Sequence, residues 1–165
     1  MKKKILVLSF IMFSASSMAA AGVWHDSGST EAEAEFAEAT SVKLELNHTA
    51  HLTTDKVGRD EALATLTATS KTPGLIGFQW KIPVTDKENA TLLTNTNDGS
   101  TVEVEFSDQS NRALMPSTQD NHWYVTQDAT NTSTKIIVQI RPTVDDQAVT
   151  PGSYNGMLQA ARYVE

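Results

Sequence analysis

Residues 75–84 read L-I-G-F-Q-W-K-I-P-V and show the clearest alternation of apolar and polar side chains in the sequence. Polar Gln79 and Lys81 stand between the members of a large apolar series. That series consists of Ile76, Phe78, Trp80, Ile82 and Val84. Because successive side chains of a β-strand point to opposite faces, the alternation predicts a strand with one face in a core.

The same alternation recurs along the chain. Residues 101–107, T-V-E-V-E-F-S, place Val102, Val104 and Phe106 on one face and two glutamates on the other. Residues 134–142 do the same with Ile136, Val138 and Ile140. Further strands are predicted at 42–46, 61–69, 122–127 and 153–163. Short strands separated by polar turns, without a long segment of helical period, predict a single all-β sandwich domain.

The first 21 residues have the parts of a secretory signal peptide. Lys2, Lys3 and Lys4 form a basic start, an apolar run follows, and small residues lead to Ala21. The apolar run is shorter than the roughly 20 residues that a bilayer requires, which argues against a membrane span. We therefore predict an exported chain that is cleaved after Ala21, with cleavage after Ala19 as the alternative.

Composition excludes several classes of partner and scaffold. Cleavage would remove three of the 13 Lys and Arg residues and none of the 20 Asp and Glu residues, so the mature charge is near −10. Such a charge repels nucleic acid and anionic lipid. The chain has no cysteine, which excludes a disulfide scaffold and thiol chemistry.

Residues 29–48, S-T-E-A-E-A-E-F-A-E-A-T-S-V-K-L-E-L-N-H, predict two consecutive strands without a hairpin turn between them. In the first, Ala32, Ala34 and Phe36 share one face, and glutamates occupy the other. Helix propensity offers an alternative for 31–39, but the continuation into a second alternating segment favours strands. A half-buried strand needs a backbone partner and a cover for its apolar face.

Sites for chemistry are scarce in this sequence. His48 and His51 are three residues apart, a spacing that suits a metal only in a helix or a tight turn, and no carboxylate is placed to complete the site. Asp145 and Asp146 are adjacent on the chain, so a strand would point them to opposite sides. We find no nucleophile motif or glycine-rich phosphate loop. The sequence predicts no catalytic, metal or cofactor site.

His122, Trp123 and Tyr124 follow a very polar stretch. They could form an exposed aromatic patch that binds a ligand. In the alternative interpretation, alternate members of this group enter the core as a strand begins. We favour the second interpretation.

Three segments carry a resemblance to a known family. Residues 29–46 followed by A-L-A-T-L-T-A-T-S resemble the N-terminal part of the capsule-forming subunits of the chaperone–usher pathway. The closing T-P-G-S-Y-N-G-M-L-Q-A-A-R-Y-V resembles the final strand of those subunits and of Afa/Dr-type adhesin subunits. Because Afa/Dr subunits carry a disulfide, the absence of cysteine makes this chain more similar to the capsule-like group.

The resemblance implies an incomplete immunoglobulin-like sandwich, which a donor strand from a neighbouring subunit completes. It implies a donor extension at 22–39 and a pilin domain at 40–165. Ala32, Ala34 and Phe36 would insert as plugs into the groove of a neighbour. The groove would be bordered by the final strand, with Leu158 and Ala160 facing the core and Met157, Ala161 and Tyr163 facing the other way. Tyr154, Leu158, Ala160 and Tyr163 are the predicted groove-bordering residues.

The resemblance also implies a function and its partners. We expect a non-catalytic structural subunit of a surface fimbria or capsule-like fibre, exported through the periplasm. Its partners would be identical subunits, a periplasmic chaperone and an outer-membrane usher, without nucleic acid or cofactor. The alternative is a polymeric adhesin that binds a host receptor. An exported enzyme or carbohydrate-binding module is a third class, which lacks support from any catalytic cluster or row of exposed aromatic residues.

Overall fold

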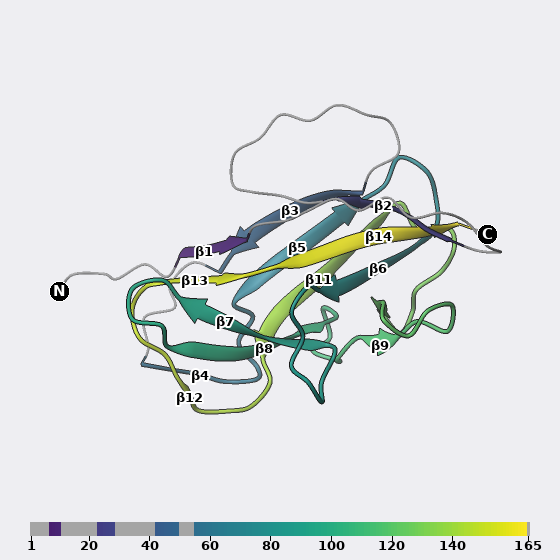
Figure 1. The fold of residues 1–165 in the computed structure, drawn as a ribbon. Coiled ribbons are helices and arrows are strands. Elements are labelled where there is room, and N and C mark those ends of the chain that lie inside the picture. The colour runs from purple at the N-terminus through teal and green to yellow at the C-terminus, as the bar shows by residue number, and fades with distance from the viewer. Residues whose placement is uncertain (1–6, 11–22, 29–41, 50–54, 165) are drawn as a thin grey trace.

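The computed structural model describes residues 7–10, 23–28, 42–49 and 55–164, and the ordered elements among them are β-strands joined by turns (Figure 1). The strands are β1 (Val7–Phe10), β2 (Val23–Gly28), β3 (Lys43–His48), β4 (Lys56–Val57), β5 (Ala64–Thr69), β6 (Leu75–Trp80), β7 (Ala90–Asn95), β8 (Thr101–Ser107), β9 (Met115–Pro116), β10 (Tyr124–Val125), β11 (Lys135–Pro142), β12 (Gln147–Ala148), β13 (Ser153–Gly156) and β14 (Leu158–Val164). The all-β prediction is confirmed.

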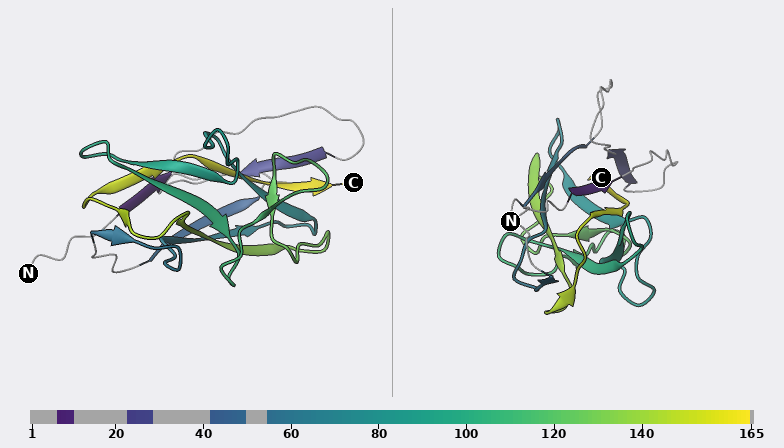
Figure 2. Two further views of the ribbon diagram at one scale, coloured as in Figure 1. Left: turned by 90° about the horizontal axis from the view of Figure 1, so that it is seen from below. Right: turned by 90° about the vertical axis from the view of Figure 1, so that its left-hand side faces the viewer.

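Two sheets form the body of the molecule. The larger sheet has the strand order β1-β13-β7-β8-β11-β5-β3, and the smaller has the order β2-β14-β6-β10-β9. β4 and β12 form a separate ribbon. The described pairings are antiparallel except for β1 with β13, which is parallel. Two further views show the sheets as the layers of a sandwich (Figure 2).

The core lies between the inner faces of the two sheets. Leu66 on β5 and Phe106 on β8 come from the larger sheet, and Phe78 and Trp80 on β6 come from the smaller one; all four are fully buried. The Trp80 ring stacks on Phe106 with 4.2 Å between ring centroids. Each such side chain contributes on the order of 1.5 to 3 kcal/mol by leaving water, so packing between the sheets supplies the stability that disulfides do not.

The strand predicted at 75–84 ends earlier than expected. Ile76, Phe78 and Trp80 are buried as predicted, but β6 ends at Trp80 and the side chain of Ile82 is 64% exposed. The prediction was therefore wrong for Ile82 and Val84. Pro83 has no N–H to donate to a sheet ladder, and its ring favours a turn.

β7 is a strand that the sequence analysis did not predict. It runs from Ala90 to Asn95 between β13 and β8 in the larger sheet. Its threonines and two adjacent leucines obscure the period of two, because Leu93 is fully buried while Leu92 is 49% exposed. This strand is important for the final segment of the chain, which pairs with it.

The final segment, predicted as one strand, is divided between the two sheets. β13 pairs with β7, and β14 pairs with β6. The division falls at Met157, whose carbonyl oxygen accepts a hydrogen bond from the N–H of Lys81 (3.0 Å). Tyr154 and Leu158 are both members of the core cluster, so the alternation of faces continues through the division.

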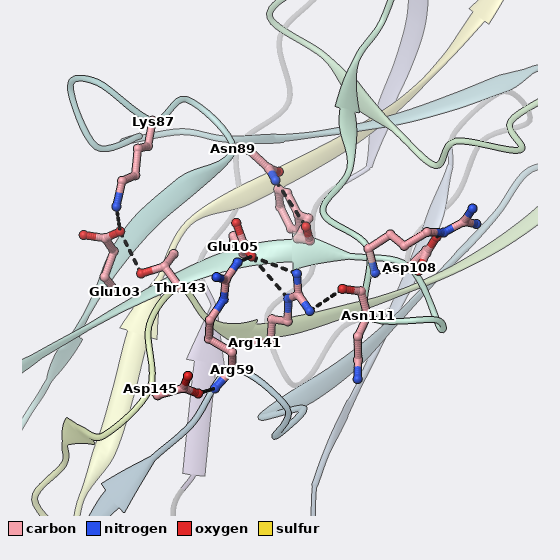
Figure 3. A network of polar contacts seen from close by, with 12 residues as sticks. Arg59, Lys87, Asn89, Glu103, Glu105, Asp108, Asn111, Arg141, Thr143 and Asp145 are labelled. Carbon is pink, nitrogen blue, oxygen red and sulfur yellow. Dashed lines mark hydrogen bonds and ion pairs between the residues drawn. The ribbon is translucent and has the colours of Figure 1, made fainter.

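A polar network lies on the outer face of the larger sheet (Figure 3). Arg141 on β11 is only 5% exposed and donates from Nη2 (3.0 Å) and Nε (3.2 Å) to Glu105 on β8. It also donates to the carbonyl oxygen of Asn111. Arg59 lies 3.7 Å from the same glutamate, and its N–H donates to Asp145. The network therefore fastens two loops onto the sheet, on the face away from the core.

Candidate functional site

The last two strands have one edge bound to the rest of the sandwich and a second edge that faces away from it. On the first edge, the N–H of Thr96 donates to the carbonyl oxygen of Ser153 (2.8 Å), and the N–H of Lys81 donates to the carbonyl oxygen of Met157 (3.0 Å). Both acceptors are odd-numbered, and the backbone groups of alternate residues in a strand point to opposite edges. The even-numbered residues of 153–164 therefore present their backbone groups to the second edge. We call this second edge, along Ser153–Val164, the acceptor edge.

Strands from the N-terminal part of the chain pair along the acceptor edge (Figure 1). β2 pairs antiparallel with β14, with Val23 opposite Val164 and Gly28 opposite Ala160. β1 pairs parallel with β13, with Val7 opposite Ser153. β1 lies within the predicted signal peptide, and β2 lies in the predicted donor extension. The acceptor edge is therefore able to take an added strand in either direction.

Tyr154 holds the start of β13 in place. Its hydroxyl accepts a hydrogen bond from the N–H of Thr150 (2.9 Å) and donates to the carbonyl oxygen of the same residue (3.0 Å). Nearby Asn95 donates from Nδ2 to Oγ1 of Thr150 (2.9 Å). At Gly152 a Cβ would collide with the side-chain amide of Asn95. A tyrosine whose hydroxyl bonds to the backbone a few residues upstream is also found in immunoglobulin-like sandwiches.

Asp98 joins this cluster from the turn between β7 and β8. Its carboxylate accepts hydrogen bonds from the side chain (2.7 Å) and N–H (2.8 Å) of Ser100 and from the Thr150 hydroxyl (2.7 Å). The hydrogen bonds from Ser100 and Thr150 lower the pKa of Asp98. The charged carboxylate thus ties the β7–β8 turn to the segment that leads into β13.

The groove-bordering residues predicted from the resemblance lie as follows. Tyr154, Leu158 and Ala160 are buried in the core cluster, with Leu158 opposite Trp80 and Ala160 opposite Phe78 on β6. The side chain of Tyr163, expected on the other face, is also buried, at 8% exposure, and it is outside the core cluster. The strand thus lies at the border of the core. The role of these four residues in a groove stays a prediction.

The predicted plugs Ala32, Ala34 and Phe36 lie outside the described residues. The described part of the extension, β2, comes just before them and pairs along the acceptor edge. Whether the plugs fill a groove therefore stays a prediction.

The predicted aromatic patch contains only one exposed member. Trp123 and Tyr124 are 9% and 8% exposed, whereas His122 is exposed and its Nδ1 lies 2.9 Å from a carboxylate oxygen of Asp120. Tyr124 belongs to the core cluster and pairs with Phe78. The burial agrees with the interpretation that this segment enters the core. A ligand at these residues stays a prediction.

An open hollow was not predicted from the sequence. It has a volume of about 560 Å³ and lies beside β7 and the junction of β13 and β14. Exposed Ile82 and Leu92 line it together with Asn155 and Met157. The signal in the sequence was Leu92 next to Leu93, two large apolar residues that cannot both face the same core.

The described residues offer no place for a metal. No group of three His, Cys, Asp or Glu side chains is close enough to bind a metal in that part of the chain. His48 is at the end of β3, where burial lowers its pKa; His51 lies outside the described residues. Where the structure is described, it holds no helix of the length and apolarity that crossing a membrane demands.

Comparison with solved structures identifies the architecture. A subunit from AAF fimbriae of enteroaggregative Escherichia coli, studied for fibronectin binding and biofilm formation, aligns with a TM-score of 0.55 and 13% identity over 75% of this chain and 98% of that chain. The minor tip subunit HdaB of the E. coli Hda pilus aligns with a TM-score of 0.57 and 12% identity over 75% and 84%. This chain has the fold of a fimbrial subunit. The resemblance predicted from the sequence is confirmed at the level of structure.

The sequence of this chain is only 12–13% identical to these structural neighbours. No family model matches it, and no curated protein matches it. The fimbrial-subunit fold is thus shared without close sequence similarity.

Proposed function

We propose that the protein is a non-enzymatic structural subunit of a surface fimbria or capsule-like fibre, and that subunits polymerise by donor-strand exchange. The observation that carries this proposal is the antiparallel pairing of β2 with β14. The N-terminal segment adds a strand to the acceptor edge within one chain, and the same segment of another copy can form the same ladder. Exchange of an identical element between copies is a low-cost route to assembly.

Signal-peptide cleavage would change this edge. If residues 1–21 are removed, β1 goes with them, and the backbone groups of Ser153–Gly156 that faced it lose their partner. An unpaired strand edge over an apolar core is an aggregation hazard. The subunit therefore needs a cover before assembly, which a periplasmic chaperone would supply until an outer-membrane usher exchanges it for the strand of the next subunit.

The proposal predicts that residues 22–39 are required for polymerisation and not for folding with a chaperone. Deleting them while keeping 1–21 should give an exported subunit that is recovered as a chaperone complex and forms no polymer. The unmodified chain, expressed beside it, should give a ladder of heat-resistant oligomers on denaturing gels. Such a ladder from the deleted chain would overturn the proposal.

A second candidate function is receptor binding by the polymer. The hollow beside β7 favours it, because exposed apolar surface marks interaction sites and the hollow presents Ile82 and Leu92 to solvent. Fibronectin is the first receptor to test, since the work on the AAF fimbriae concerns fibronectin binding.

The test replaces both exposed apolar residues by serine and measures binding of assembled polymer to fibronectin-coated surfaces and to host cells. Val144→Ser is the matched control, because Val144 is 49% exposed on another part of the molecule. Loss of binding in the double variant alone supports an adhesin. No binding by unmodified polymer leaves the scaffold function as the better account.

A further inference from the structure

We propose that Asn155 is a site of spontaneous deamidation, and that the reaction proceeds while the backbone of Gly156 is uncovered at the edge of β13. The reaction itself depends on described residues of β13 and their neighbours. Its suppression in a polymer rests on the proposed strand exchange. The modification would mark subunits that have aged without assembling.

The chemistry joins the side chain of an asparagine to the next backbone nitrogen. The nitrogen of Gly156 attacks Cγ of Asn155, so a C–N bond forms, the Cγ–Nδ2 bond breaks, and ammonia leaves with the proton of the Gly156 N–H. Water then opens the cyclic imide at one of its two carbonyl carbons. One opening gives aspartate, and the other gives isoaspartate, whose main chain runs through Cγ. Water is the only co-reactant, and nothing is oxidised or reduced.

The sequence offers two pairs for such a reaction. Asn155–Gly156 is the only Asn–Gly pair in the chain, and Asp98–Gly99 is a related Asp–Gly pair. Glycine favours ring closure in both, because it has no Cβ to crowd the nitrogen or to restrict the backbone. The structure separates the two pairs by how each side chain is held.

The Asp98 side chain is fixed and charged. Its carboxylate accepts hydrogen bonds from the hydroxyl and N–H of Ser100 and from the Thr150 hydroxyl. These hydrogen bonds lower the pKa of Asp98. A carboxylate that stays charged is a poor electrophile, so the Asp98–Gly99 pair is protected.

The Asn155 carboxamide is not held in this way. Its Oδ1 is buried without a hydrogen-bond partner, and no hydrogen bond is found for its Nδ2 in the part of the chain that the structure describes. Asn95, in contrast, donates from Nδ2 to Thr150 and accepts at Oδ1 from the N–H of Asn97. A short carboxamide without such partners is free to turn toward its own backbone.

The position of Gly156 in the fold controls access to its nitrogen. β13 ends at Gly156, and the chain passes to the other sheet at Met157. Gly156 is even-numbered, so its N–H points to the acceptor edge, where β1 pairs with Ser153–Gly156. Extended backbone holds the nitrogen away from Cγ, and ring closure therefore needs local opening. Such opening is rare in a strand paired on both edges and more frequent at an uncovered strand end.

Either product would damage the site. Aspartate puts a carboxylate where the buried Oδ1 finds no donor, and a buried charge without a partner is unfavourable. Isoaspartate inserts an additional main-chain atom between Tyr154 and Leu158, which both belong to the core cluster. That atom disrupts the alternation that points both side chains to the core. We therefore expect a deamidated subunit to assemble less well than a fresh one.

The test compares two fractions of the same exported protein, unassembled subunit and polymer, separated by size and kept in warm, mildly alkaline buffer. Alkaline buffer accelerates the reaction because the attacking nitrogen must lose its proton. Mass spectrometry of the tryptic peptide 136–162 measures conversion at Asn155, and an isoaspartyl methyltransferase labels the isoaspartate product. We expect conversion to accumulate in the unassembled subunit and to be undetectable in the polymer over the same period.

An internal reference and two variants test the chemistry. Asn97 is exposed and precedes Asp98, so it should convert far more slowly than Asn155. Gly156→Ala keeps the asparagine and crowds the nitrogen, and it should abolish conversion. Asn155→Gln requires a larger ring and should also stay unmodified, which provides a second test if Gly156→Ala fails to fold.

Three results would overturn the inference: an unmodified Asn155 in the unassembled subunit, conversion no faster at Asn155 than at Asn97, or equal conversion in subunit and polymer. Failure of the proposed strand exchange is recognised separately. In that case the unmodified chain forms no polymer, and faster conversion at Asn155 than at Asn97 in the single subunit still decides whether the site exists.

Discussion

At the scale of single residues, Tyr154 connects the core to the acceptor edge. Its ring is fully buried, while its hydroxyl bonds to both the N–H and the carbonyl oxygen of Thr150. Asn95, at the end of β7, and Asp98, in the turn that follows, bond to the same threonine. One tyrosine thus fixes where the last segment enters the sheet and hence where the acceptor edge begins.

Replacing Tyr154 by phenylalanine removes only the hydroxyl and its two hydrogen bonds to the Thr150 backbone. We expect the free energy of unfolding to fall by about 0.5 to 1.5 kcal/mol, measured by urea denaturation of the purified mature subunit. Tyr124→Phe is the control, because no hydrogen bond is found for the Tyr124 hydroxyl among the described residues. Equal losses from the two variants would contradict the role given to Tyr154.

Asp108 gives the protein a predicted sensitivity to acid. Burial raises the pKa of this carboxyl, but hydrogen bonds from the N–H and side chain of Arg112 and from the N–H of Ser110 outweigh it, so the pKa is lowered. A carboxyl whose pKa is lowered by folding stabilises the folded state at pH values above its pKa in the unfolded chain, which is about 3.9. That stabilisation is lost as the pH falls through the lower pKa that the carboxyl has in the folded protein.

Asp108→Asn should therefore lower stability at pH 7 and flatten the loss of stability below about pH 4. Urea midpoints of both proteins across the acid range measure this. Parallel curves for the parent and the variant would show that Asp108 does not contribute in this way.

At the scale of elements, the sequence of the proposed donor extension predicts one apolar face and one acidic face. Phe36→Asp would place a charge on the face proposed to be buried, where desolvation costs several kcal/mol. We expect this variant to form no heat-resistant polymer, while Glu33→Lys, on the face proposed to be exposed to solvent, assembles normally. The amount of oligomer that survives boiling is the measurement, and equal effects of the two changes would contradict the assignment of faces.

Alternation predicted the strands whose two faces differ strongly in polarity. Phe106 on β8 and Val138 on β11 are fully buried as the pattern required. β7 was missed because it carries the exposed Leu92 directly before the buried Leu93. Apolar and polar residues alternate clearly only when one face of a strand is buried and the other is polar. A strand with an apolar residue on its outer face therefore shows a weak alternation in the sequence.

The candidate site was predictable only in part. The final strand and the burial of Leu158 and Ala160 followed from sequence pattern and resemblance. Its division at Met157 did not follow, because sheet membership depends on pairing with β7 and β6, which lie far away in sequence. The Tyr154 cluster was also missed, because its contacts reach back 54 residues to Ser100.

At the scale of the whole molecule, packing between the sheets stabilises the sandwich, and the proposal assigns its completion to a strand added along the acceptor edge. The described pairing ends in β3 on one side of the larger sheet and in β2 on one side of the smaller sheet. A neighbour's strand along the acceptor edge would join subunits through a continuous backbone ladder. Because every hydrogen bond of that ladder must open together, we expect the polymer to dissociate slowly. Its lifetime would then be governed by the rate of dissociation and not by an equilibrium free energy.

In the proposed function, residues 22–39 complete the sandwich by pairing beside β14. The pairing of Val23 with Val164 makes a direct test available, because a short flexible turn after Glu165 can lead into the same segment as a hairpin. Residues 22–39 are moved from the front of the mature chain to this position. Urea unfolding of this rearranged chain is then compared with that of a chain that lacks 22–39. We predict a soluble monomer that unfolds cooperatively without a chaperone; stability no greater than that of the deleted chain would contradict strand donation at this edge.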